Sequence, residues 1–390
     1  MCCWLTTDSQ LKYNSPQMND LHLHIISFDI PYPANYGGVI DVYHRIRMLS
    51  GAGVKIHLHC FEYGRSHSRE LESLCFEVNY YKRDTSIRNL FRRTPYIVCS
   101  RRSNELIERL LQDDYPILME GLHCCDLLND SRFADRNTIV RIHNIEHEYY
   151  SLLAEQEHNP LRRLYLKSEA RKLRNFEKIL AKAKHLITLN QKENDYLNGL
   201  YGNATLIPAF HEFDEICSLE GKGVHILYHA NLSVPENQTA AEWLITNVFR
   251  HTDLPVKIAG LNPPKHLKKL IAKYKNIELE ENPPEERMQE LIRNAHITVM
   301  YTLQPTGLKL KLLHSLFSGR FCLVNSTMVA GSELGQLCHI ADTAEDFQKK
   351  IRQLASAKFD KFELERRNMI LSNLYSNFRN RDRVVRIIDN

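Results

Sequence analysis

One stretch near the C-terminal end, residues 306–325 (TGLKLKLLHSLFSGRFCLVN), constrains the fold more than any other part of the chain. An apolar run precedes it, and a loop with Gly307 leads into a predicted helix that carries Lys309 and Lys311 in its first turns. Gly319 ends this helix, and a second apolar run follows as the next strand. Free backbone N–H groups and the positive end of the helix dipole meet at such a helix start, and lysine adds a full charge. The stretch therefore predicts an α/β domain that binds a diphosphate at this loop.

The N-terminal half opens on the same kind of unit. Residues 21–26 alternate between polar and apolar side chains, and a loop with Gly37 and Gly38 follows them. A predicted helix and a second strand come next, and this order implies a parallel sheet with helices on its faces. Because ligands of such sheets lie at the carboxyl ends of strands, the two glycines are candidates for the wall of a ligand site. The alternative is a tight turn that needs glycine only for its backbone angles.

Ionisable side chains gather after another predicted strand, at 138–142. His143, Asn144 and Glu146 come directly behind it. At the carboxyl end of a strand, such residues could contact a sugar hydroxyl or transfer a proton. The alternative is a helix N-terminus with Asn144 as its cap and the acidic residues favoured by the dipole. Both can hold, because a cap explains Asn144 but leaves His143 unexplained.

The overall charge argues against nucleic acid as the main partner. The chain has 51 basic and 47 acidic residues in 390, which gives a net charge of +4. One segment, 88–102, is locally basic, with five arginines among aromatic and apolar residues. It could face a lipid headgroup or an acidic substrate, and a solvated loop face is an equal alternative.

Cysteine spacing and hydropathy indicate a cytoplasmic protein. None of the ten cysteines forms a C-x-x-C pair, so neither a zinc site nor a disulfide framework is supported. No apolar run reaches the roughly 20 residues that a membrane span needs. The N-terminus has neither a basic start nor a long apolar centre, so no signal peptide is expected.

Taken in order, these stretches resemble the nucleotide-sugar glycosyltransferases of the GT-B fold, in the retaining class called glycosyltransferase group one. PYPANYGGVIDVYHRI is similar to the family's first glycine loop and helix, and IVRIHNIEHEYY to its strand-end histidine segment. ILYHANLSVPENQTAAEWL resembles the first strand and loop of the donor domain, and residues 306–325 resemble its glycine–basic–helix block. The resemblance implies an α/β protein with two Rossmann-like domains that face each other across a cleft.

The resemblance also implies domain boundaries. We expect an irregular extension at 1–19, an acceptor-side domain at 20–208, a nucleotide-sugar donor domain at 209–365, and a C-terminal helix at 366–390 that crosses back to the first domain.

By position, the resemblance implies a role for each motif in the N-terminal domain. Gly37 and Gly38 would line the donor diphosphate. His143 would be catalytic and reach the transferred sugar, with Asn144 and Glu146 near the acceptor.

In the C-terminal domain, Asn231 would lie under the donor. Gly307 would bind the diphosphate, and Lys309 and Lys311 would be the catalytic cations that hold it. Two glutamates that usually lie eight residues apart in this block are replaced by Thr306 and His314. Both side chains can still form a hydrogen bond with the sugar-nucleotide donor, although neutral His314 offers one hydrogen-bond acceptor and no carboxylate.

The expected activity is transfer of a hexose from a UDP- or GDP-sugar to a glycan or lipid-linked acceptor, with retention at the anomeric carbon. Lysines and helix N–H groups would stabilise the leaving diphosphate, so no divalent metal and no cofactor are expected. Peripheral contact with the inner face of a membrane is a further expectation. Two alternatives remain: a catalytically silent protein that binds sugar nucleotides, and a nucleotide-sugar epimerase that needs no acceptor.

Overall fold

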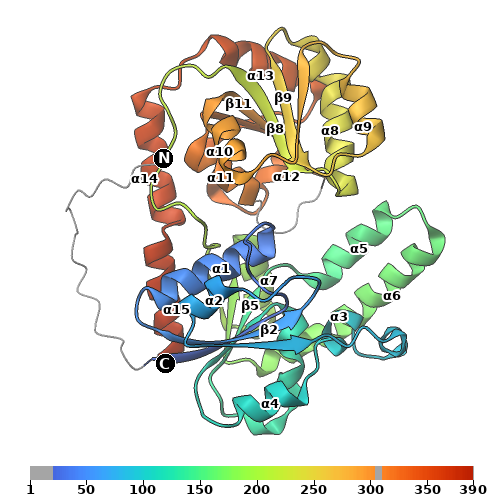
Figure 1. Ribbon diagram of the computed structural model, residues 1–390, viewed down its shortest axis with the longest axis vertical. Coiled ribbons are helices and arrows are strands. Elements are labelled where there is room, and N and C mark those ends of the chain that lie inside the picture. Colours follow the sequence, from blue (N-terminus) through green and yellow to red (C-terminus); the bar gives the residue numbers. More distant parts are fainter. Residues whose placement is uncertain (1–20, 304–309, 390) are drawn as a thin grey trace.

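The computed structural model describes residues 21–303 and 310–389, which form two α/β domains, one above the other in Figure 1. Within these residues, seven strands form the N-terminal sheet in the order β3-β2-β1-β4-β5-β6-β7. Six strands form the C-terminal sheet in the order β10-β9-β8-β11-β12-β13. Every neighbouring pair is parallel. The predicted α/β class with two Rossmann-like domains is confirmed.

The strands of the first sheet are β1 (His22–Ser27), β2 (Lys55–Glu62), β3 (Glu77–Lys82), β4 (Ile117–Glu120), β5 (Thr138–Ile142), β6 (His185–Thr188) and β7 (Ala204–Leu206). Those of the second are β8 (His225–Asn231), β9 (Val256–Leu261), β10 (Ile277–Glu281), β11 (Ala295–Met300), β12 (Phe321–Val324) and β13 (His339–Ile340). The α-helices are α1 (Gly37–Ser50), α2 (Arg69–Leu74), α3 (Tyr96–Cys99), α4 (Asn104–Leu110), α5 (Glu146–Gln156), α6 (Pro160–Phe176), α7 (Gln191–Tyr201), α8 (Pro235–Asn247), α9 (Lys265–Ile271), α10 (Glu285–Asn294), α11 (Leu310–Ser318), α12 (Ser326–Val329), α13 (Ala344–Ser356), α14 (Lys361–Leu374) and α15 (Asn377–Ile388). None of these helices combines the length and the apolar character needed to cross a bilayer.

The central strands are buried on both faces, which is why they appear in the sequence as continuous apolar runs. Every residue of β4, β5, β11 and β12 is buried. The edge strands β3, β7 and β13 escaped prediction, because they are short or only partly buried and lack this signal.

The C-terminal segment differs from the single helix expected at 366–390. It forms two helices, α14 and α15, because the chain leaves the helical path at Tyr375 and Ser376 caps α15 by accepting a hydrogen bond from the backbone N–H of Arg379. Helix α14 packs on the C-terminal domain through Leu371, whereas α15 packs on the N-terminal domain through Val384.

The chain therefore crosses between the domains twice, and the two crossings are hydrogen-bonded to each other. The ring of His211, in the first crossing, donates to the carbonyl oxygen of Tyr375 at 2.8 Å. The side chain of Asn377 donates to the carbonyl oxygen of His211 at 2.8 Å, and its oxygen accepts from the backbone N–H of His211 at 3.2 Å.

Four histidines form a ladder across β1 and β2. His22 pairs with His57, and His24 pairs with His59, each at 2.8 Å between ring nitrogens. The Nε2 atom of His24 also lies 3.0 Å from an oxygen of the Asp113 carboxylate. Burial lowers the pKa of His24 to about 4, although Asp113 acts in the opposite direction, and burial also holds the pKa of His59 well below its usual value.

This ladder predicts loss of stability in mild acid. A buried histidine with a lowered pKa stays neutral in the native state, whereas the unfolded chain takes up its proton near pH 6.5. The free energy of unfolding should therefore fall as pH drops below about 6.5, with each such histidine contributing up to about 1.4 kcal/mol per pH unit. Urea unfolding between pH 7 and 5 measures the slope. His59→Gln should make it shallower, whereas His266→Gln, at an exposed position, should leave it unchanged. Equal slopes for both variants would contradict the assignment.

Candidate active site

A cleft of about 480 Å³ lies between the two domains. The N-terminal domain contributes the loop before α1 and the first turns of that helix. The C-terminal domain contributes the carboxyl ends of β8 and β9, the residue Thr302 after β11, and the first turns of α8 and α11. The described lining residues are Asn35, Tyr36, Gly37, Ile40, His211, Glu212, Phe213, His229, Ala230, Asn231, Val234, Glu236, Asn237, Gly260, Leu261, Met288, Thr302, Leu310, Lys311 and His314.

Two helices from opposite domains begin at this cleft. Helix α1 starts at Gly37, and its N-cap residue Tyr36 makes no side-chain capping hydrogen bond. Helix α11 is described from Leu310, at the opposite wall. Neither helix has an acidic residue in its first turn. The free N–H groups and positive dipole end of α1 are therefore available to an anion in the cleft, and α11 adds a second helix start.

Lys311 brings a full positive charge to the same place. Helix α11 buries its apolar face, including Leu312 and Leu316, so that Lys311 and His314 lie on the side that lines the cleft. The ammonium group of Lys311 lies 3.5 Å from the side-chain oxygen of Asn237. Among the described lining residues, Lys311 is the one Lys or Arg side chain.

His314 provides a neutral hydrogen-bonding group. Its ring packs against Phe213, with 4.9 Å between centroids, and its Nδ1 lies 3.5 Å from the Glu212 carboxylate. Burial lowers the pKa of His314 to about 4, and burial raises that of Glu212 to about 7. The buried Nε2 atom of His314 has no hydrogen-bond partner among the residues that the structure describes. An uncharged imidazole with one unsatisfied nitrogen can bind a ligand hydroxyl.

Asn231 organises the loop on which the donor is expected to lie. Its side-chain oxygen accepts from the backbone N–H of Ser233 at 3.1 Å and from the Ser233 hydroxyl at 2.7 Å. Nearby, Glu236 accepts a hydrogen bond from the hydroxyl of Thr302 at 2.5 Å. This bond fixes the start of α8 to the end of β11, just before the loop that carries the predicted diphosphate contacts.

The two adjacent glycines have different environments. Gly37 lines the cleft, and a Cβ atom there would lie 3.9 Å from Leu310 of the opposite domain. A Cβ atom at Gly38 would lie 2.8 Å from the ring of Phe28, so this glycine is needed for packing inside the N-terminal domain. Gly38 is not among the cleft residues.

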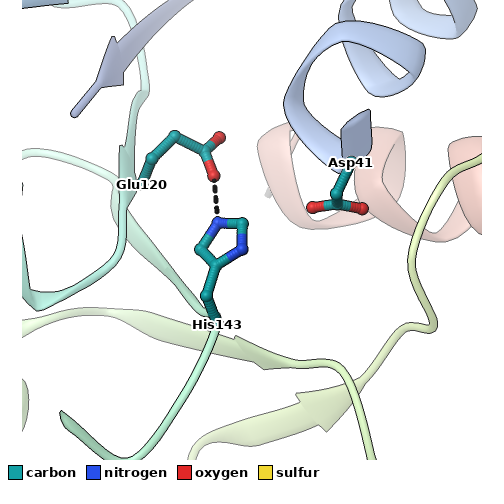
Figure 2. Close-up of side chains that lie close together, drawn as sticks. All are labelled: Asp41, Glu120 and His143. Atoms are coloured by element: carbon teal, nitrogen blue, oxygen red, sulfur yellow. Dashed lines mark hydrogen bonds and ion pairs between the residues drawn. The ribbon is translucent and has the colours of Figure 1, made fainter. Parts of the chain in front are cut away.

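His143 belongs to a buried charge network below α1 (Figure 2). Its Nε2–H donates to the Glu120 carboxylate at 2.9 Å, and burial lowers its pKa to about 3 despite the nearby Asp41 carboxylate. Arg45 bridges Asp41 and Glu120, while Arg141 donates twice to Asp41, at 2.6 and 2.8 Å. Burial alone would raise the pKa of Asp41, but the two guanidinium groups outweigh it and hold that pKa well below its usual range.

The same network contains the residue types that bind metal ions, but its carboxylates are already neutralised by arginines. One ligand atom each of Asp41, Glu120 and His143 lies within 4.8 Å of the others. Both carboxylates already bind guanidinium groups, from Arg45 and Arg141. A cation would have to displace these arginines, so the donor set does not fit a metal, and we interpret the group as a structural network.

Asn144 and Glu146 lie at the start of α5, outside the cleft. The N-cap position is Ile145, so the alternative interpretation of Asn144 as the helix cap is wrong. Glu146 is buried, and burial, followed by repulsion from Glu193, raises its pKa to about 8. It is therefore largely protonated at pH 7 and could donate a proton.

The cleft brings together some predicted site residues and not others. Gly37, Asn231, Lys311 and His314 line it, whereas Gly38, His143, Asn144 and Glu146 do not. Thr306, Gly307 and Lys309 fall outside the described residues. Reasoning from the sequence missed Glu212, Glu236 and the Asp41–Arg45 pair. The i,i+4 spacing of that pair within an apolar helix face was an available signal.

No family model matches the chain. A protein described as an uncharacterized 44.6 kDa protein in the cps region of Klebsiella pneumoniae is 27% identical over 347 residues, which cover 84% of this chain and 89% of that protein.

Solved structures match nearly the whole chain. TarM is 11% identical, with 96% of this chain and 100% of TarM covered and a TM-score of 0.67. Anabaena HepE, solved with UDP and glucose, is 9% identical, with 95% and 99% covered and a TM-score of 0.63. Likeness at these identities establishes the fold, which is the GT-B fold that the sequence resemblance predicted.

The buried network should be essential for stability. Arg45→Met removes a positive charge that pairs with the buried Asp41 and Glu120 carboxylates. We therefore expect the free energy of unfolding to fall by about 3–5 kcal/mol. The midpoint and slope of urea unfolding measure it. Lys268→Met is the matched control, because the ion pair of Lys268 with Glu281 is on the surface and should be worth less than about 1 kcal/mol. A loss below that value for Arg45→Met would refute the role.

Proposed function

We propose that this protein is a retaining glycosyltransferase that moves a hexose from a UDP- or GDP-sugar to a glycan or lipid-linked acceptor. The observation that carries the proposal is the interdomain cleft at which α1 and α11 begin, with Lys311 in the first turn of α11. Two helix starts and one ammonium group provide positive potential at a single place, and a diphosphate is a ligand that fits it.

The difficult step of such a transfer is departure of the nucleoside diphosphate. The bond between the anomeric carbon and the phosphate oxygen breaks, and negative charge develops on the diphosphate. Lys311 and the N–H groups at the start of α1 would stabilise that charge, since they are fixed in place before the reaction. Removing one fixed donor of this kind typically costs roughly 3–4 kcal/mol of barrier.

The nucleotide and sugar would be held by neutral groups. The unsatisfied Nε2 of His314 and the loop fixed by Asn231 are the candidates for contacts with donor hydroxyls. We propose that catalysis needs no divalent metal, because Lys311 and the helix starts would supply the positive charge that a metal would otherwise provide beside the diphosphate. Activity that persists after treatment with EDTA would support this part, and activity lost to EDTA and restored by Mg²⁺ or Mn²⁺ would refute it.

The acceptor would approach through a groove beside the cleft. This groove, of about 790 Å³, shares Asn35 and Tyr36 with the cleft. Tyr32 and Tyr63 expose their rings in it, and Arg65 also lines it. Aromatic faces combined with polar groups suit a sugar chain, which has apolar ring faces and hydroxyl edges.

Two alternatives use the same cleft. A silent binder would be stabilised by a nucleotide without turning over any donor, and an epimerase would convert the donor alone into a sugar isomer. The replaced glutamates keep the first alternative open. A thermal-shift screen of UDP, GDP, ADP and their sugars, followed by product analysis with and without acceptors, separates the three. A bound nucleotide at 100 times its Kd should add about 2.7 kcal/mol of stability.

Lys311→Ala should lower kcat by roughly 10²–10³-fold, because it removes a charge that acts on the leaving diphosphate. Transfer kinetics measure this effect, and circular dichroism checks the fold. Lys265→Ala is the matched control, since Lys265 also begins a helix of the same domain but lies outside the cleft. Near-normal transfer by Lys311→Ala would refute the role.

Tyr63→Ala should raise the acceptor KM roughly two- to tenfold, because an aromatic contact is worth about 0.5–1.5 kcal/mol. The donor KM should not change. Phe76→Ala is the control, because Phe76 is 62% exposed, like Tyr63, but lies outside the groove. A change in the donor KM alone would show that Tyr63 contacts the donor and not the acceptor, and would refute this role.

A further inference from the structure

Two segments of the N-terminal domain that are distant in sequence lie against each other. They are the loop at 85–95, which includes the short 3-10 helix η1 (Ile87–Phe91), and helix α6. The ammonium group of Lys172 donates to the carbonyl oxygen of Leu90 at 2.8 Å. The Glu169 carboxylate accepts from the backbone N–H of Tyr96 at 2.7 Å. In Figure 1, α6 and α5 form a hairpin that extends away from the body of the domain.

These segments concentrate positive charge. Residues 85–95 contain three arginines and no acidic residue, and residues 160–176 contain six basic residues and one acidic residue. The acidic residue, Glu169, is buried and bonded to Lys172. The two segments thus carry an excess of eight positive charges, whereas the whole chain carries +4, so the remainder of the protein is net acidic.

Most of this charge is exposed to solvent and without a counter-ion from the protein. Within the described part of the chain, a set of six exposed cations forms no ion pair with an acidic side chain. These are Arg88, Arg92, Arg93, Lys167, Arg171 and Arg174.

Large apolar side chains are exposed in the same two segments. Ile87 is 70% exposed, Phe91 85%, Leu161 79% and Leu164 67%. On α6, Leu164 shares one helix face with Lys167 and Arg171, because residues three and seven positions apart lie above one another. The opposite face, which includes Glu169, packs on the domain. An outward face that combines leucines with cations is typical of proteins that lie on an anionic membrane.

We propose that this basic–apolar surface, formed by residues 85–95 and helix α6, binds an anionic lipid bilayer. The cations would contact headgroup phosphates, while Phe91 and Leu161 would enter the boundary between headgroups and acyl chains. A nucleic acid would also attract the cations, but it offers no apolar phase for the leucines. The α5–α6 hairpin begins at Glu146, at the carboxyl edge of β5. If the proposed transferase activity holds, this surface would bring the acceptor side to the membrane, which favours a lipid-linked acceptor.

The test is binding of the full-length protein to vesicles. We expect co-sedimentation with phosphatidylcholine vesicles that contain phosphatidylglycerol, little with pure phosphatidylcholine, and release of the protein at high salt. Arg171→Glu/Arg174→Glu should weaken binding roughly tenfold or more, because each cation near an anionic surface contributes substantially. Leu161→Ser/Leu164→Ser should weaken it by a similar factor at unchanged charge.

Matched controls keep the test specific. Lys265→Glu/Lys269→Glu introduces the same charge change at exposed sites of α9, and Phe362→Ser removes a side chain that is 70% exposed on α14. Both should bind like the wild type. Equal binding by all variants, equal binding to neutral vesicles, or duplex DNA as the preferred partner would overturn the proposal. Nucleotide thermal shifts of the same variants report on the cleft separately, so failure of the transferase proposal would be distinguishable from failure of membrane binding.

Discussion

The neutral cluster of Asp41, Arg45, Glu120 and Arg141 is the interaction on which the rest of the structure depends. Asp41 and Arg45 belong to α1, Glu120 ends β4, and Arg141 lies in β5. Asp41 also accepts from the backbone N–H of Phe210, in the connection between the domains, at 2.8 Å. A single set of buried charges thus fixes the first helix, two strands and the interdomain connection relative to one another. The start of α1 at the cleft is a consequence of this arrangement.

The cleft itself has little positive charge from side chains. Lys311 is the one lysine or arginine among the described lining residues, which also include Glu212 and Glu236. Backbone dipoles would therefore supply a large part of any attraction for an anion, and dipoles that are held in place need no reorientation when charge develops. This links the buried cluster under α1 directly to the proposed chemistry above it.

Much of the fold could be predicted because parallel strands buried on both faces leave continuous apolar runs in the sequence. Edge strands such as β3 leave no such run, and the break before α15 depends on one serine cap. In the site, Lys311 was predicted from a helix start that follows a strand, whereas Asn231 was predicted from the family resemblance, and both line the cleft. The place of His143 could not be predicted, because its partner Glu120 lies on a neighbouring strand 23 residues earlier.

The paired crossings at His211 and Asn377 have a mechanical consequence. Two chain segments pass between the lobes side by side and are hydrogen-bonded to each other, so they define a single pivot. A connection of one segment would let the two domains rotate relative to each other in any direction. Two segments that are hydrogen-bonded to each other favour rotation about a single axis. His211 also borders the cleft, so this pivot lies at its edge. If the domains open to admit a donor and close to exclude water, both movements would be rotations about this same axis, in opposite directions.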